Sequence, residues 1–184
     1  MAERQLHGFT FEQAIIKEMN ITPTKNYTDE WDGMYGEIPV SIKCIKNGSD
    51  IDMADYFRNS NKNKDFILIV GFWENDGNNI VNTHYLFIPA EEWRLMFPLE
   101  FAEKFKNLLT GITNSHEDDE RWKEEINELK KEWKDKTNNL IRPRFKRDHK
   151  SQKRIQCAIN YNDFYNYFLK KYEINWGEFS GKRN

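Results

Sequence analysis

The stretch Phe66-Ile67-Leu68-Ile69-Val70-Gly71-Phe72-Trp73 is the most apolar run of the chain. Its length and its β-branched content are typical of a strand that is covered on both faces. The turn residues 75–79 follow directly and predict a return strand from Ile80 to Ile88. Pro89 then opens a helix over about 90–96, because proline is tolerated in a first helical turn. We therefore expect a β-sheet built around this run.

Upstream of the run, the pattern predicts a helix, a hairpin and a second helix. Residues 10–19 combine a good N-cap with apolar residues at the helical period. Residues 27–46 contain the turn Tyr35-Gly36-Glu37 between two strand-like runs, which predicts a hairpin. Residues 50–58 are expected to be helical, and the polar residues 59–64 to form a loop.

Downstream of Pro98 the sequence favours helices, over 99–109, 114–136 and 162–171. The longest of them is highly charged but carries one apolar seam, which we expect to pack against the core or a second subunit. The seam residues are Trp122, Ile126, Leu129 and Trp133. The predicted fold class is α/β (α+β), with a central mixed sheet flanked by helices over 1–98 and a helical C-terminal half over 99–184.

Composition excludes several classes of protein. The 184 residues include 28 Lys+Arg and 30 Asp+Glu, and the net charge of −2 excludes a generally basic nucleic-acid binder. Aromatic residues make up 15 %, which argues against intrinsic disorder. Only Cys44 and Cys157 are present, so a disulfide scaffold and a cysteine zinc site are excluded. No apolar stretch approaches the roughly 20 residues of a membrane span, and the first residues lack a secretory pattern. We expect a cytoplasmic protein with no membrane partner.

One group of residues carries a recognisable chemistry. The strand period of two places Ser41 and Lys43 on one face, next to Asp32 of the preceding hairpin strand. A divalent cation could bind the Asp32 carboxylate, the Ile42 carbonyl and water. Lys43 would then act on the attacking water or on a phosphate, as metal-assisted phosphodiester hydrolysis requires. Taken singly, Asp32 before Gly33 is typical of a turn and Lys43 of a solvent-facing strand residue; their joint placement favours the site.

The order of elements and the motif Val40-Ser41-Ile42-Lys43 resemble the PD-(D/E)xK nucleases, whose best-known members are type II restriction endonucleases. The resemblance covers about residues 8–97. It implies a restriction-endonuclease-like core that uses Mg²⁺, for which Mn²⁺ can substitute. Asp32 matches the acid that binds the metal, Glu12 the helix acid that supports it, and Lys43 the lysine of the motif. Attack by water would leave a 5′-phosphate.

Two positions depart from the family pattern. Trp31 stands where the family has proline before the acid. Ser41 stands where the family has its second acid, and a hydroxyl is a weaker metal ligand than a carboxylate. Some members accept a neutral polar residue there, and Glu37 or Glu12 could compensate.

A basic run follows the long helix. Seven of the 13 residues from 142 to 154 are Lys or Arg, which predicts a surface for a polyanion. We expect the following residues to contact DNA: Arg142, Arg144, Lys146, Arg147, Lys150, Lys153 and Arg154. The alternative is a solvated surface segment balanced by the acidic long helix. A homodimer would suit cutting both strands of a palindrome.

The sequence thus predicts a Mg²⁺-dependent endonuclease of double-stranded DNA, best matching a type II restriction endonuclease. One alternative is a structure-selective nuclease, such as a junction resolvase or a repair enzyme, with the same site. The other is a non-catalytic DNA- or protein-binding module that retains the fold, which Ser41 at the second acid position favours.

Overall fold

The computed structural model describes residues 3–24, 29–74, 79–111, 117–147 and 153–181. The chain is mixed α/β, as predicted. It divides into two compact units, each assembled from separated stretches. The first unit comprises Met1–Ile51, Asn63–Glu91 and Asn160–Asn184; the second comprises Asp52–Lys62 and Glu92–Ile159. Among the described residues, no helix is both long and apolar enough to span a bilayer.

The first unit is built on a five-stranded mixed sheet of order β1-β2-β3-β5-β6. Its strands are β1 (Thr22–Pro23), β2 (Gly33–Tyr35), β3 (Ile38–Lys46), β5 (Phe66–Glu74) and β6 (Asn79–Ile88). The sheet is mixed because β3 and β5 run parallel while the other neighbours are antiparallel. β5 is the apolar run, and residues 66–72 are all buried, which confirms the prediction of a strand covered on both faces.

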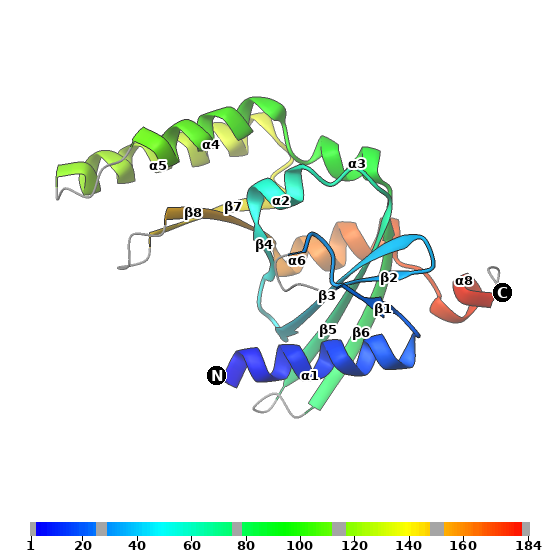
Figure 1. Ribbon diagram of the computed structural model, residues 1–184. Helices are drawn as coiled ribbons and strands as arrows, with labels where there is room; N and C mark the ends of the chain where they lie inside the picture. Colours follow the sequence, from blue (N-terminus) through cyan, green and yellow to red (C-terminus); the bar gives the residue numbers. More distant parts are fainter. Residues whose placement is uncertain (1–2, 25–28, 75–78, 112–116, 148–152, 182–184) are drawn as a thin grey trace. The chain divides into compact units, whose positions relative to one another are not determined.

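Helix α1 (Glu3–Glu18) packs on one face of this sheet (Figure 1). It begins earlier than the predicted helix over 10–19. Its buried residues Phe11 and Ile15, and Met19 just after its end, meet side chains of β3 and β5. The opposite face meets the C-terminal segment, where Phe72 contacts Phe164 at 5.6 Å between ring centroids. There lie α6 (Tyr161–Asp163), η2 (Phe164–Phe168) and α7 (Leu169–Tyr172), whereas Trp176 and Phe179 of α8 (Trp176–Gly181) pack on the same core cluster as α1.

The second unit packs helices on a three-stranded sheet of order β4-β8-β7. Its elements are β4 (Ile51–Asp55), α2 (Tyr56–Ser60), α3 (Ala90–Leu95), α4 (Leu99–Gly111), α5 (Glu117–Lys136), β7 (Ile141–Arg147) and β8 (Lys153–Ile159). Of the α5 seam, Trp122, Ile126 and Trp133 are buried within the chain itself. The seam therefore packs internally, and it is not available to a second subunit.

Three expectations from the sequence are corrected. The C-terminal half is not wholly helical, because the basic run lies in and between the paired strands β7 and β8. The predicted helix over 50–58 is strand β4 followed by the short helix α2, which Asp55 caps. The predicted polar loop over 59–64 contains two buried residues, since the Asn59 side chain bonds backbone oxygens and Lys62 lies over the Trp93 ring.

Candidate active site

The candidate site forms where β2 separates from β3. The register of the two strands ends at Gly33 and Val40, and the Asp32 N–H still donates to the Val40 carbonyl at 2.9 Å. Two residues further along β3, the Ile42 N–H donates its hydrogen bond to the side chain of Asp32, at 2.6 Å from Oδ2. A side-chain carboxylate thus takes the place of a strand carbonyl, which fixes its position against the backbone of β3.

Asp32 Oδ2 collects two further donors. Lys43 Nζ lies 3.2 Å from it, and Ser41 Oγ lies 3.3 Å from it. Lys43 Nζ also donates to the Ile42 carbonyl at 3.0 Å. The side chains of Lys43 and Asp32 are 20 % and 29 % exposed, so the pair is open to a ligand yet partly shielded from water. The structure therefore brings together Asp32, Ser41, Ile42 and Lys43, as the strand period predicts.

Glu12 reaches the same site from α1. Burial raises the pKa of the Glu12 carboxyl, and the negative charge of Asp32 raises it further, while Lys43 acts in the opposite direction. Because the charges of Asp32 and Lys43 both act on its pKa, Glu12 lies within electrostatic range of the pair. Glu12 is thus the candidate for a second carboxylate at the site.

The position of Glu12 depends on how closely α1 approaches β5. Its neighbour Phe11 lies with its ring against Gly71, where an added Cβ would be only 2.3 Å from Phe11 Cζ. Gly33, the neighbour of Asp32, likewise permits a close approach, because an added Cβ there would lie only 2.4 Å from Ile21 Cγ2. Nothing in the sequence pattern singles out Gly71 or Gly33, since only the tertiary packing makes their missing side chains necessary.

The oxygen atoms of the site fit a hard divalent cation. Mg²⁺ is commonly held by one or two carboxylates and keeps several waters. Asp32 and Glu12 would supply the carboxylates, and Ile42 a backbone carbonyl. In the part of the chain that the structure describes, no three Asp, Glu, His or Cys side chains form a metal-binding group, so water must complete any coordination sphere. The ammonium of Lys43 bridges Asp32 Oδ2 and the Ile42 carbonyl, which are two of those oxygens.

The two departures from the family pattern have clear structural positions. Ser41 is 3 % exposed, and its hydroxyl serves Asp32 as a hydrogen-bond donor. Trp31 packs on Phe66, with ring centroids 5.1 Å apart. Glu37 lies exposed in the turn between β2 and β3, at the far end of the hairpin from Lys43. Of the two acids proposed to compensate for Ser41, Glu12 lies at the site, and Glu37 lies in the turn away from it.

The basic run belongs to the second unit and forms a two-faced hairpin. In the antiparallel register, Arg142, Arg144 and Lys146 of β7 lie opposite Ala158, Gln156 and Arg154 of β8. Residues that are directly opposite share a face, so these six line one side. Lys150 lies outside the described residues, as do the side chains of Arg147 and Lys153. The alternation of charged and apolar residues over 142–146 is the signal that could have predicted these strands.

Comparison with known proteins finds no match among protein families, curated proteins or solved structures. The resemblance to the PD-(D/E)xK nucleases therefore stays an expectation from the sequence.

Proposed function

We propose that this chain is a Mg²⁺-dependent endonuclease that hydrolyses phosphodiester bonds of double-stranded DNA, with a restriction-endonuclease-like core. A cytoplasmic type II restriction endonuclease is the best match. The observation that supports it is the position of the Lys43 ammonium, 3.2 Å from Asp32 Oδ2 and 3.0 Å from the Ile42 carbonyl, within electrostatic range of Glu12. Carboxylates next to a lysine are the groups that metal-assisted phosphoryl transfer requires.

Each residue has a distinct role in this proposal. Asp32, Glu12 and the Ile42 carbonyl would hold the cation, which when bound supplies charge neutralisation and a more acidic water. Lys43 orients the attacking water or donates to a non-bridging phosphate oxygen, where negative charge develops. Ser41 holds the Asp32 carboxylate against the strand by its hydroxyl. The product would carry a 5′-phosphate.

The first experiment is digestion of unmethylated phage DNA by the full chain in Mg²⁺, and separately in Mn²⁺. Lys43→Met removes the ammonium while it retains most of the length of the side chain. Lys46→Met is the matched control, since Lys46 is an exposed residue of the same strand that lies over the Trp73 ring. Discrete fragments from the parent and from Lys46→Met, lost in Lys43→Met and in EDTA, would support the proposal.

Two other outcomes lead to the alternatives. Cutting of branched DNA without discrete plasmid or phage fragments would indicate a structure-selective nuclease. Binding without cleavage under every divalent metal would indicate a non-catalytic DNA-binding module. A specific observation favours that second alternative: Ser41 presents a donor to Asp32 where a nuclease of this type has a further carboxylate.

A homodimer remains part of the proposal because a palindromic site offers two equivalent strands. The α5 seam is excluded as its contact, since the seam is buried within the chain. Sedimentation of the full chain with and without a duplex would measure its oligomeric state.

A further inference from the structure

The sheet of the second unit has one face that helices cover and another lined by cations. On the covered face, Phe145 contacts the Phe105 ring of α4 at 5.3 Å, and Lys130 of α5 lies over the Phe145 ring. Ile155 and Cys157 of β8 are buried on this same side. The strand alternation places Arg142, Arg144, Lys146 and Arg154 on the other side, together with Gln156 and Ala158. We call these six residues the basic face.

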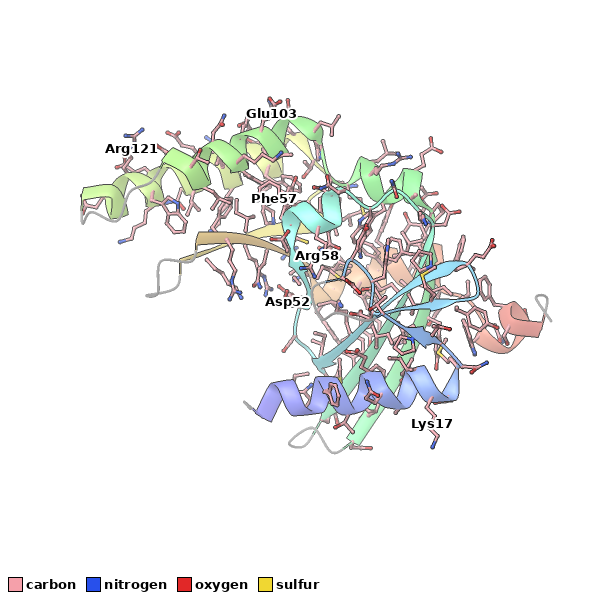
Figure 2. All side chains as sticks on the ribbon, in the orientation of Figure 1. Lys17, Asp52, Phe57, Arg58, Glu103 and Arg121 are labelled. Atoms are coloured by element: carbon pink, nitrogen blue, oxygen red, sulfur yellow. The ribbon has the colours of Figure 1, made fainter. Side chains whose placement is uncertain are left out.

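The charged side chains of the basic face are partly or fully exposed, whereas Ala158 is buried. Arg154 is exposed, and Arg142, Arg144, Lys146 and Gln156 are of intermediate exposure. Figure 2 shows nitrogen-ended side chains that project from β7 and β8 on the side away from α4 and α5. In the third strand, β4, the Asp52 carboxylate accepts a hydrogen bond from the Ala54 N–H. The described strands β7 and β8 contain no Asp or Glu, so the four cations make this face basic in a protein whose net charge is −2.

The dimensions of the basic face suit a groove of duplex DNA. Residues two apart on a strand lie about 6.8 Å apart, so Arg142 and Lys146 are separated by about 14 Å along β7. The major groove is about 12 Å wide and admits a two-stranded ribbon. Past β4, β7 and β8 continue side by side as such a ribbon (Figure 1). Cations at the two ends of the face would thus meet the phosphates that border the groove.

The cross-strand pair Arg144 and Gln156 occupies the centre of this face. Arg recognises guanine through two acceptors, and Gln recognises adenine through one donor and one acceptor. The Gln156 Oε1 is enclosed and accepts no hydrogen bond within the described residues. An enclosed acceptor without a donor is costly, and a base amino group could supply that donor once the Gln156 side chain turns outward. The ends of the face therefore carry charge, and the centre carries groups that distinguish bases.

We propose that the basic face lies in the major groove of duplex DNA, with Arg144 and Gln156 at the base edges and Arg142, Lys146 and Arg154 at phosphates. This inference rests on the proposed function, because it takes double-stranded DNA as the substrate. It adds that sequence preference is set by a sheet in the second unit, whereas the Asp32–Lys43 site belongs to the first.

Binding without divalent metal tests the inference separately from cleavage. Fluorescence anisotropy would follow the full chain on a labelled duplex at several salt concentrations, after enrichment of the preferred sequence from a randomised pool. Lys146→Gln and Arg154→Gln should each reduce the slope of log K against log salt by about 1. Lys123→Gln, at an exposed position of α5, removes the same charge from the helix layer and should leave the slope unchanged.

Gln156→Ala and Arg144→Lys test base recognition, because neither changes the net charge. Each should lower the preference for the enriched sequence over random duplex by about tenfold or more, at an unchanged salt slope. An unchanged preference in both variants, equal weakening by Lys123→Gln, or tighter binding to duplex RNA would overturn the inference. If the basic-face variants bind DNA like the parent chain while Lys43-dependent cleavage persists, the inference fails and the proposed function stands. If the face binds as described and no metal permits cleavage, the proposed function fails instead.

Discussion

The ring of Phe11 lies against the backbone of Gly71, so closely that a Cβ on Gly71 would stand 2.3 Å from Phe11 Cζ. Phe11 is 7 % exposed and belongs to the core cluster between α1 and the sheet. Its neighbour in sequence, Glu12, is the acid that α1 brings to Asp32 and Lys43. Because Glu12 follows Phe11 in α1, we expect the contact of Phe11 with Gly71 to influence where the Glu12 carboxylate lies.

We predict that Gly71→Ala weakens Mg²⁺ binding and cleavage by displacing α1. The added methyl group overpacks the interface, which costs about 1–3 kcal/mol of stability. Isothermal titration of Mg²⁺ and urea denaturation would measure the two effects. The double variant Gly71→Ala with Phe11→Leu makes room for the methyl group and should recover much of the metal affinity. Failure of this rescue, with stability restored, would show that the helix position does not control the site.

The Lys43 ammonium is expected to compete with a divalent cation, because it bridges Asp32 Oδ2 and the Ile42 carbonyl. Lys43→Met should therefore bind Mn²⁺ more tightly than the parent chain, while cleavage falls by about 10²-fold or more. Electron paramagnetic resonance of Mn²⁺ measures binding independently of activity. Weaker Mn²⁺ binding in Lys43→Met than in Lys46→Met would contradict a metal position between these two oxygens.

Glu12 gives the site a pH dependence of defined sign. Burial and Asp32 raise the pKa of Glu12 in the folded chain, so its ionisation opposes folding. The stability contribution of the protonated group is complete below the unfolded-state pKa and is lost as pH rises through the folded-state pKa. Glu12→Gln should accordingly raise the Tm at pH 8 without metal, and this gain should vanish at acidic pH. Thermal scans across pH would show no gain at either pH if Glu12 were solvated.

The affinity for metal should depend on the ionisation of Glu12 in the opposite direction to the stability of the fold. A cation prefers the ionised carboxylate, so Mg²⁺ affinity of the parent chain should fall as pH drops through the raised pKa of Glu12. Glu12→Gln should bind Mg²⁺ more weakly and lose most of this pH dependence. Titrations in two buffers of different ionisation enthalpy would count the protons released. An equal proton count in the parent and in Glu12→Gln would assign the released proton to another group.

Trp133 tests the internal packing of the α5 seam. It is 1 % exposed, contacts Phe101 and Phe105, and donates from Nε1 to the Ile141 carbonyl at 2.8 Å. Trp133→Ala should destabilise the chain by about 3–5 kcal/mol, as urea denaturation would measure. The loss should not depend on protein concentration. A concentration-dependent loss would indicate that the residue stabilises an assembly instead.

The sequence predicted the elements whose periodicity is strong and local. The buried run of β5, the hairpin at Gly36 and the charged helix α5 each follow from the spacing of apolar residues over short stretches. The Asp32, Ser41 and Lys43 cluster was predictable for the same reason, because a strand period of two and one short turn bring these residues together.

The rest depends on tertiary packing. The sequence favours a helix over 50–58, whereas the structure has strand β4 there, followed by the shorter helix α2 that Asp55 caps. The charge of the basic run predicts a surface for a polyanion, but charge alone does not indicate its secondary structure. The alternation of its cations with Pro143 and Phe145 is typical of a strand. The requirement for glycine at 71 arises only from the approach of α1, and no local pattern encodes such a contact.

The chain crosses between its two units four times, after residues 51, 62, 91 and 159. Every proposed catalytic residue lies within the first 43 residues. The ribosome therefore makes them all long before the last stretch of the first unit is synthesised. The last stretch of the first unit, Asn160–Asn184, includes Ile174, whose N–H donates a hydrogen bond to the Tyr85 carbonyl of β6 at 2.8 Å. A nascent chain must complete the whole second unit before the sheet beneath the site gains this edge. We expect DNA-cutting activity to appear only late in synthesis, and we expect neither unit to fold as a simple truncated fragment.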